Sequence, residues 1–434
     1  MAAARKYHRV LGQLGLPFND PFEHFQMLHD EQRATAILWH RQAQGNRWIK
    51  LNPTDPMIPE ILRAHEGKQD TYITPNEFNG WRLIRLLKSL RSTYVDLDGQ
   101  TDIYAVLDRL HENRLPDPSA MLYSGRGLHL YWLHDPVPAQ VLPVWQLMQD
   151  ELIRVLKPLG ADAAAKDCTR LLRLSGTVNS KSADQVVGHV LDGHRWPFRS
   201  LANEVLGERR KSAEVRDLRA RRKASDKAIK GSIYARWHMV YHDLLKISAA
   251  HGHSIPTGQR DKWLFLAGCS LSWFTHPEGI EAEISSIGRT ETDLSAADFA
   301  DAIQPNLKRA RDAAEGKKML WNGQSVDTRY RFRRQTLFNW LEPIIPATLL
   351  PQLRAIIPDG LATERESARQ KNRDRATEGR YRTKYTLQVV RASNAEKRAQ
   401  ARSLRDGGAS FRCIAAELAV SYETIRKWCA VGVN

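Results

Sequence analysis

The sequence predicts a protein of the α+β class, in which a sheet-containing region is followed by an all-α region. Between residues 36 and 133, short runs of β-branched and aromatic residues alternate with turn residues, which is typical of strands. From residue 232 to 350, apolar residues recur at helical spacing throughout. A stretch rich in Arg and Lys and poor in apolar side chains separates the two regions. We therefore expect strands and helices to form separate parts of the chain.

The charge of the chain points to a polyanionic partner. The 434 residues include 65 Lys and Arg against 49 Asp and Glu, a formal net charge of +16. Such a surplus attracts polyanions, of which nucleic acid is the commonest. The basic residues concentrate at 205–230, 307–334 and 363–405. No basic amphipathic stretch carries bulky apolar anchors, so we expect no membrane partner.

The sequence also indicates a cytoplasmic protein. No stretch is long and apolar enough to span a bilayer, and the N-terminus lacks the apolar segment of a signal peptide. The four cysteines are too scattered for a zinc knuckle or a disulfide framework, which fits a reducing compartment. They are Cys168, Cys269, Cys413 and Cys429.

Apolar periodicity and turn residues divide the first 204 residues into alternating elements. Asp20 is expected to cap the first helix, with Pro21 in its first turn. The expected helices are 17–29, 81–90 and 102–113, and the expected strands are 36–39, 48–51, 71–74, 92–98, 121–123 and 128–133.

The strand at 92–98 carries two carboxylates, Asp96 and Asp98. Because side chains two residues apart in a strand project from the same face, the two acids would lie side by side. They would repel each other unless a cation lay between them, and their hard oxygen atoms favour Mg²⁺ or Mn²⁺ over zinc. Taken alone, the pair also fits two solvated acids at the end of a strand, before the turn at Gly99.

A second element is the turn Ser124-Gly125-Arg126-Gly127, which precedes the strand containing His129. The glycines allow close approach of a ligand to the backbone, while Ser124 and Arg126 offer a hydroxyl group and a planar cation. A lone histidine is often structural. The presence of Arg126 in the same segment favours a triphosphate contact for His129.

A third element spans residues 160–181. Asp162 and Asp167 are both candidates for a third carboxylate, and Arg170 and Arg173 are candidate phosphate ligands. Leucines alternate with these arginines, which favours a half-buried strand that directs its guanidinium groups into a site. A solvated strand edge is the alternative.

In this order and spacing, the three elements resemble the archaeo-eukaryotic primase superfamily, and above all the RepB′-like replication primases of plasmids and other mobile elements. The resemblance covers roughly residues 30–200. It implies a primase-type, RRM-like catalytic domain with a mixed sheet. It also implies that two Mg²⁺ or Mn²⁺ ions are held by Asp96, Asp98 and Asp162, and that His129, Arg170 and Arg173 contact the nucleotide.

The implied activity is that of a DNA primase, a nucleotidyltransferase that uses nucleoside triphosphates on a single-stranded DNA template by two-metal catalysis. The family usually has serine two residues before the histidine, where this chain has Gly127. Ser124 or Arg126 would then supply that contact. Asp162 fits the spacing to the arginines better than Asp167. The rival interpretation is a DNA-binding initiator or regulator whose primase-like domain is inactive.

The remaining chain is expected to divide into four parts. These are a basic linker at 205–231, a helical domain at 232–362 that resembles the domain following the catalytic domain in such primases, a charged linker at 363–396, and a C-terminal domain at 397–434. The charged linker has the composition of a long exposed helix or of a tether. The chain contains no P-loop, so any helicase is expected to be a separate protein.

The C-terminal domain resembles the helix-turn-helix of resolvases and transposases. Ser410 and Ser421 would cap its last two helices, after a helix at 397–407. Tyr422, Arg426 and Lys427 would then face the major groove of double-stranded DNA. A small protein-interaction bundle is the alternative.

Overall fold

The computed structural model describes residues 17–99, 102–207, 232–321, 323–381 and 387–429. The chain divides into two compact units, Met1–Ile357 and Pro358–Asn434. Most of the predicted basic linker, from residue 208 to 231, lies outside the described residues.

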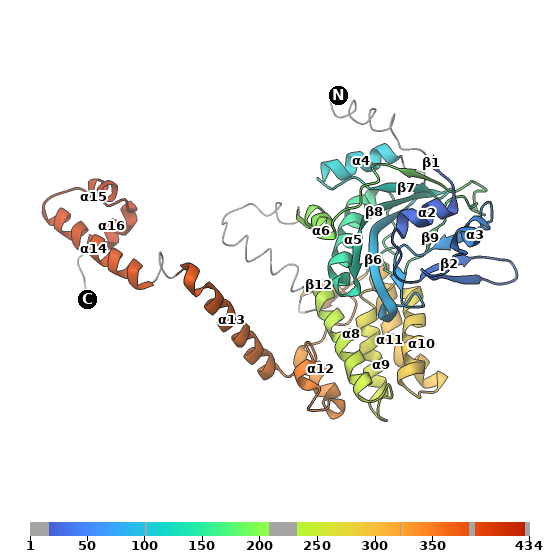
Figure 1. Cartoon of the computed structure of the whole chain (residues 1–434). Helices are drawn as coiled ribbons and strands as arrows, with labels where there is room; N and C mark the ends of the chain where they lie inside the picture. The colour runs from blue at the N-terminus through green and yellow to red at the C-terminus, as the bar shows by residue number, and fades with distance from the viewer. Residues whose placement is uncertain (1–16, 100–101, 208–231, 322, 382–386, 430–434) are drawn as a thin grey trace. The chain divides into compact units, whose positions relative to one another are not determined.

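A six-stranded sheet in the order β1-β10-β7-β8-β6-β5 forms the centre of the first unit (Figure 1). Its neighbouring strands all pair antiparallel, and parallel pairing occurs only in isolated bridges. The predicted α+β class is confirmed, but the mixed sheet that the resemblance implied is wrong, because the paired strands of this sheet are antiparallel. The strands are β1 (Pro17–Phe18), β5 (Glu77–Phe78), β6 (Leu87–Asp98), β7 (Ala120–Tyr123), β8 (Gly127–Pro138) and β10 (Val187–Val190).

A smaller sheet has the order β3-β2-β4-β9. Three of its strands match the predictions from β-branched and aromatic runs, and the fourth, predicted around the leucines and arginines at 170–174, is only two residues long. The strands are β2 (Ala36–His40), β3 (Arg47–Leu51), β4 (Thr71–Ile73) and β9 (Leu172–Arg173). The hairpin formed by β2 and β3 projects from the first unit (Figure 1).

The face of β6 that carries Val95 and Leu97 packs against helices, so that Asp96 and Asp98 lie on the opposite face. These two apolar residues are fully buried among side chains of α4 (Ile103–Glu112), α5 (Leu142–Leu156) and α6 (Phe198–Gly207). The predicted helix at 102–113 is confirmed as α4, with Asp102 as its cap. The predicted helix at 17–29 is shorter and forms α2 (Pro21–Leu28), and Asp20 accepts a hydrogen bond from Phe22 N at its start. The short α3 (Ile58–Arg63) follows β3.

The predicted helix at 81–90 is wrong. Only a 3₁₀ turn, η1 (Ile84–Leu86), forms there, and β6 begins at Leu87. Leu87 pairs with Phe78 of β5 and Leu90 pairs with Val137 of β8. Pairing with two neighbouring strands satisfies the backbone and buries both leucines, and it outweighs the helical spacing of the apolar residues.

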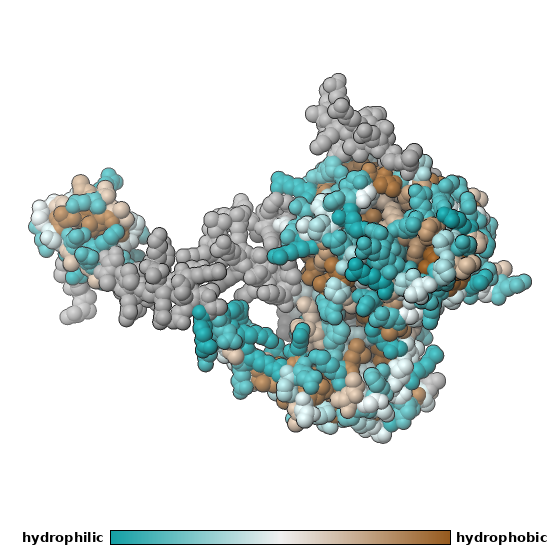
Figure 2. Space-filling view, in the orientation of Figure 1, coloured by the Kyte–Doolittle hydropathy of each residue, from teal (hydrophilic) through white to brown (hydrophobic). Residues whose placement is uncertain are grey.

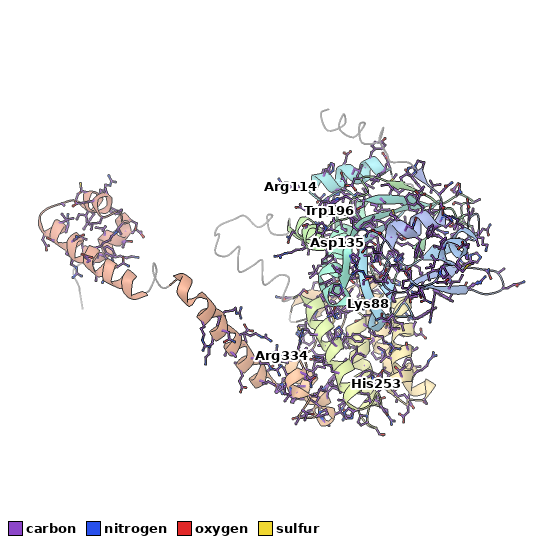
Figure 3. The ribbon with its side chains drawn as sticks, in the orientation of Figure 1. Lys88, Arg114, Asp135, Trp196, His253 and Arg334 are labelled. Carbon is purple, nitrogen blue, oxygen red and sulfur yellow. The ribbon has the colours of Figure 1, made fainter. Side chains whose placement is uncertain are left out.

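The far end of β8 is held by the loop that precedes α6. Asp135 N donates a hydrogen bond of 2.9 Å to the carbonyl oxygen of Trp196, and Figure 3 shows the two residues close together. On β6, the exposed side chain of Lys88 is also labelled there. The end of β8 away from His129 is therefore tied to the loop before α6.

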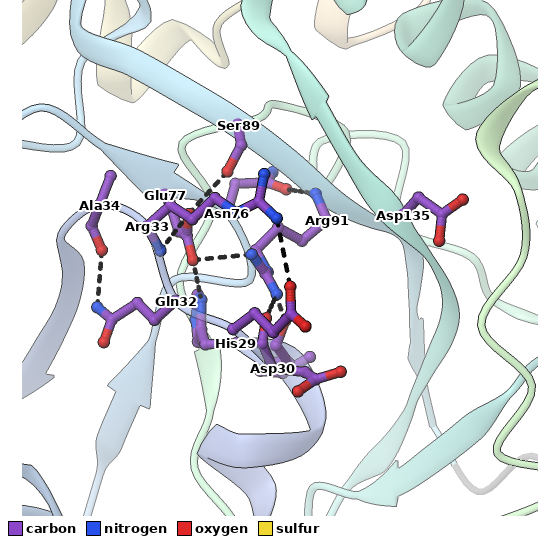
Figure 4. Close-up of polar contacts among 12 residues, drawn as sticks. His29, Asp30, Gln32, Arg33, Ala34, Asn76, Glu77, Ser89, Arg91 and Asp135 are labelled. Carbon is purple, nitrogen blue, oxygen red and sulfur yellow. Dashed lines mark hydrogen bonds and ion pairs between the residues drawn. The ribbon is translucent and has the colours of Figure 1, made fainter. Parts of the chain in front are cut away.

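A network of buried charged groups joins β5, β6 and the loop after α2 (Figure 4). Arg91 Nη1 lies 3.1 Å from Glu77 Oε1, and both side chains are almost fully buried. Glu77 Oε2 also accepts a hydrogen bond of 2.8 Å from Ser89 Oγ. His29 Nδ1 lies 3.6 Å from Glu77 Oε1. Arg91 donates to the carbonyl oxygens of Leu28 and Asp30. These contacts fix the start of β6 to the N-terminal part of the chain.

Helices follow residue 232, as the apolar spacing predicted, with one exception. Residues 318–321 and 324–327 pair as two antiparallel strands, so the prediction of helical structure throughout 232–350 is wrong there. Gly323 has a positive φ of 75°, which suits a tight turn and not a helix. The elements are α8 (Ile233–Ala250), α9 (Arg260–Leu271), α10 (Pro277–Glu291), α11 (Ala296–Ala314), β11 (Lys318–Trp321), β12 (Gln324–Asp327) and α12 (Arg334–Leu341).

The second unit is helical. Ala401, Ile414 and Ile425 form its buried centre, and Ser410 and Ser421 accept hydrogen bonds from Cys413 N and Thr424 N as predicted. Of the predicted charged linker at 363–396, the described residues 363–381 and 387–396 are helical and belong to α13 and α14. The helices are α13 (Asp359–Tyr381), α14 (Leu387–Asp406), α15 (Phe411–Glu417) and α16 (Tyr422–Cys429).

The surface seen in Figure 2 is mostly hydrophilic, with small separate apolar areas. Among the described helices, none combines the length and the apolar character that crossing a membrane requires.

Candidate functional site

Three predicted site residues lie next to one another across three adjoining segments of backbone. Asp96 of β6 is paired with His129 of β8 on one side. On its other side, Asp162 N donates a hydrogen bond of 2.8 Å to Asp96 O, next to an antiparallel bridge between Leu97 and Ala161. Asp98 lies two residues further along the same face of β6. The structure therefore brings together Asp162, Asp96, Asp98 and His129.

Two glycines make this close approach possible. A Cβ atom on Gly160 would lie 2.5 Å from Asp98 O, and Gly160 has a φ of 93°. A Cβ atom on Gly127 would lie 1.9 Å from Leu97 O. Neither position can accept a side chain without moving β6. A serine at position 127, which the resemblance led us to expect, would therefore clash with β6.

His129 is neutral near pH 7. Burial, together with the positive charges of Arg173 and Arg170, lowers the pKa of His129 to about 3. Its Nε2 lies 3.5 Å from Asp96 Oδ1. Within the described part of the chain, the buried Nδ1 has no hydrogen-bond partner. A neutral imidazole can donate one hydrogen bond to a bound group and accept another.

The carboxylates of the site oppose one another's ionisation. Burial raises the pKa of Asp96 to about 6; Arg170 lowers it and Asp162 raises it further. Burial also raises the pKa of Asp98, and the neighbouring Asp96 and Asp162 add to this rise. A cation placed among these groups would remove the repulsion.

The donor chemistry of Asp96, Asp98 and Asp162 fits hard divalent cations, since all three supply carboxylate oxygen atoms. The side chains are not converged as ligands. No group of three acidic, histidine or cysteine side chains in the described ranges is already arranged around a common point for a metal. Arg170 Nη2 instead lies 3.3 Å from Asp162 Oδ2. A cation at Asp162 would therefore share this carboxylate with Arg170.

Asp167 occupies a different position from Asp162. It is buried, its Oδ1 accepts a hydrogen bond of 2.7 Å from Thr169 Oγ1, and its carbonyl oxygen accepts one of 2.5 Å from the Tyr94 hydroxyl. Its other carboxylate oxygen lies 3.8 Å from Arg170 Nη1. These contacts favour a structural role for Asp167 and leave Asp162 as the better third carboxylate.

The predicted arginines line the same cleft but differ in their freedom. Arg170 forms ion pairs with Asp162 and Asp167, whereas Arg173 is held in a buried ion pair with Asp70. Arg173 Nη1 lies 2.9 Å from Asp70 Oδ1, and its Nη2 donates a hydrogen bond of 3.0 Å to Asn179 Oδ1. Burial would raise the pKa of Asp70, but hydrogen bonds from Ser180 and Arg173 lower it. Arg173 is thus a fixed positive charge in the wall of the cleft.

Asp70 and Tyr72 are the residues that the sequence did not point to. Asp70 lies 103 positions before its partner Arg173, and nothing in the local sequence indicates the pairing. Tyr72 lines the cleft beneath the Arg173 guanidinium, whose carbon lies 4.9 Å from the ring centroid. To predict the role of either residue, one would have to know that β4 pairs with β9, and the sequence does not show this pairing.

The cleft has a volume of about 870 Å³ and lies between the two sheets. Ser124 and Arg126, the residues selected from the glycine-rich turn, line it. Ser124 Oγ donates a hydrogen bond of 3.1 Å to Gly127 O, so this hydroxyl also closes its own turn. The charged and polar lining residues are Asp96, Asp98, Ser124, Arg126, His129, Arg170, Arg173, Asn179, Lys181, Ser182 and Asp184.

In the second unit, the three residues predicted to contact DNA lie on α16. Tyr422 is 47% exposed, and Arg426 and Lys427 are also exposed. Ile425, one turn along the helix from Tyr422, is fully buried. All three predicted side chains are therefore accessible to solvent on α16.

Comparison with known proteins gives a limited set of similarities. No model of a known protein family matches the sequence. A replication protein of Clostridium perfringens is 28% identical over 298 residues, which are 65% of this chain and 68% of that protein.

Two solved structures are also similar. The AEP domain of the cyanophage S-2L primase-polymerase is 18% identical, with a TM-score of 0.33, and covers 43% of this chain and 96% of its own. Primase RepB′ is 16% identical, with a TM-score of 0.29, and covers 67% of this chain and 96% of its own.

Proposed function

We propose that this chain, a relative of replication proteins with the motifs of RepB′-like primases, is a DNA primase. It would join nucleotides on a single-stranded DNA template during replication of a plasmid, a phage or an integrated element. The observation that carries the proposal is the alignment of Asp162, Asp96 and His129 across adjoining backbone segments, beside a cleft that Asp96 and His129 line together with Arg170 and Arg173. Acidic metal ligands beside phosphate-binding groups are what nucleotidyl transfer requires.

In this proposal Asp96, Asp98 and Asp162 would hold two Mg²⁺ or Mn²⁺ ions, which activate a 3′-hydroxyl and offset the charge of the departing pyrophosphate. Neutral His129 would donate a hydrogen bond to a phosphate oxygen without adding charge. Arg126 and Arg170 would contact the triphosphate, and Ser124 would close the turn beneath it. Arg173, braced by Asp70, would contribute positive charge at a fixed place. The reaction needs no covalent enzyme intermediate.

The wild-type chain is expected to incorporate labelled nucleotides on single-stranded DNA only when Mg²⁺ or Mn²⁺ is present. Chelation of the metal should stop incorporation, and added metal should restore it. The rival function, a DNA-binding initiator with an inactive primase-like domain, predicts DNA binding without incorporation in any metal. That result would remove the enzymatic proposal.

The division of labour along the chain is part of the proposal. Residues 1–204 would form the catalytic domain and 232–362 the helical primase domain, with linkers at 205–231 and 363–396. The C-terminal helix-turn-helix at 397–434 would direct the protein to double-stranded DNA, where Tyr422, Arg426 and Lys427 would enter the major groove. Their common exposure on α16 supports this role. Duplex unwinding would be left to a separate helicase.

Replacing Arg426 and Lys427 together by alanine is expected to weaken duplex DNA binding at least tenfold. The slope of log affinity against log salt concentration should become shallower by about two. The measurement is fluorescence anisotropy of a labelled duplex at several salt concentrations. Arg412→Ala, an equally exposed change on α15, is the control. If both variants lose the same affinity, α16 has no special role.

A further inference from the structure

A line of aromatic side chains crosses the smaller sheet, from the cleft to the outer strand. Tyr72 of β4 is paired with Arg173 of β9 on one side and with Trp39 of β2 on the other. Trp39 is in turn paired with Trp48 of β3. Because residues paired directly across strands point to the same face, these side chains form one continuous line. The ring centroids are 4.9 Å apart for Trp39 and Tyr72 and 5.6 Å apart for Trp39 and Trp48.

A fourth ring extends the line beyond the sheet. Trp81 lies 5.3 Å from Trp48, edge to face. We call Tyr72, Trp39, Trp48 and Trp81 the aromatic row. Tyr72, Trp39 and Trp81 are half-buried, whereas Trp48, on the outer strand, is 37% exposed. Trp81 also lines a groove beside α10. The aromatic row therefore begins in the candidate site with Tyr72 and reaches solvent at Trp48.

Positive charges accompany the exposed end. The guanidinium carbon of Arg82 lies 5.0 Å from the Trp48 ring centroid, and Lys50 Nζ lies 5.9 Å from that of Trp81. Arg41 and Arg47 are exposed in the β2–β3 hairpin. Aromatic rings interleaved with cations are the chemistry that binds single-stranded nucleic acid, because bases stack on the rings and phosphates pair with the cations.

We propose that the aromatic row is the binding path for the single-stranded DNA template on its way to the cleft. This inference rests on the proposed function, since it takes the bound strand to be the template. The distance from Tyr72 to Trp48 is two strand spacings, roughly 10 Å. About three stacked nucleotides span the same length. Arg82, Lys50 and Arg47 contact the phosphates, and duplex DNA, whose bases are already stacked, is not bound there.

The test uses the full chain and a labelled oligothymidylate of about 16 nucleotides, with excess unlabelled duplex DNA to occupy the C-terminal unit. Trp48→Ala is expected to weaken oligonucleotide binding about tenfold, and Trp48→Phe, which keeps a ring, less than threefold. The matched control is Trp321→Ala. Trp321 is 64% exposed on β11, outside the aromatic row, and its loss should leave the affinity unchanged. Thermal denaturation checks that each variant is folded.

A second measurement needs no variant. Ultraviolet cross-linking of a bromodeoxyuridine oligonucleotide to the wild-type chain should label peptides that contain Trp39, Trp48, Tyr72 or Trp81. Unchanged affinity in Trp48→Ala, an equal loss in Trp321→Ala, or cross-links confined to other peptides would overturn the proposal. Failure of the proposed function is distinguishable, because a chain without polymerising activity would still bind the oligonucleotide through the aromatic row.

Discussion

Replacing Asp96 by asparagine is expected to lower nucleotide incorporation on single-stranded DNA at least about a thousandfold. The substitution keeps the shape of the side chain but removes one of the charged oxygen atoms that would hold the catalytic cations, whose charge stabilisation amounts to several kcal/mol. The fold should persist. Burial already raises the pKa of Asp96, so the ionised carboxylate does not stabilise the protein.

Three measurements separate this catalytic role from a structural one. Incorporation is assayed with Mn²⁺ and Mg²⁺, and thermal denaturation is followed with and without Mn²⁺. The wild-type chain should melt at a higher temperature with Mn²⁺, and the Asp96→Asn variant should show a smaller rise. Asp108→Asn, an exposed change on α4, should affect none of these quantities. An Asp96→Asn variant that still polymerises at the wild-type rate would exclude Asp96 from the site.

Replacing Glu77 by alanine is expected to lower the free energy of unfolding by about 3–5 kcal/mol. Glu77 is fully buried, and its removal leaves the guanidinium of Arg91 buried without its counter-charge. Urea denaturation near pH 7 measures the effect. Glu31→Ala breaks an exposed ion pair with Arg33 and is expected to cost less than about 1 kcal/mol. Similar losses in the two variants would contradict a special role for the buried network.

The effect of Glu77 should also depend on pH. Burial alone would raise the pKa of Glu77, but contacts with His29, Arg91 and Ser89 hold it below its ordinary value of 4.5. The unfolded chain therefore binds a proton at a higher pH than the folded chain does. The stability that ionised Glu77 contributes is present above about pH 4.5 and is lost as the pH falls below it. The difference in the free energy of unfolding between the wild type and Glu77→Ala should therefore become smaller as the pH falls below about 4.5.

Local sequence patterns predicted most elements of the first unit, and they failed where tertiary pairing decided the outcome. The strand around Asp96 and the helix capped by Asp20 have signals within a few residues of themselves. The helix expected at 81–90 had good apolar spacing, but Leu87 and Leu90 pair with strands on both sides. The strand pair at 318–321 and 324–327 was missed because its strands are short and solvent-exposed, with no alternation of buried and exposed residues.

The candidate site was predictable to the extent that its residues stand in recognisable order. Asp96, Asp98, Asp162, His129, Arg126, Arg170 and Arg173 were all selected from spacing and family resemblance. The spacing of residues in the sequence could not reveal which acidic side chains the arginines pair with. The ion pair of Asp70 with Arg173 and the contact of Arg170 with Asp162 depend on strands that pair only in the folded chain. The same limit applies to the aromatic row, whose members come from four separate segments.

The absence of a side chain at Gly127 has a consequence for how proteins with this arrangement of acids and histidine are found. With β6 so near, any residue larger than glycine would displace Leu97 and with it the two flanking acids. Searches that demand Ser-x-His at this point will pass over proteins built in this way. A pattern that also admits glycine there, and asks for the acids and the histidine around it, would recover them.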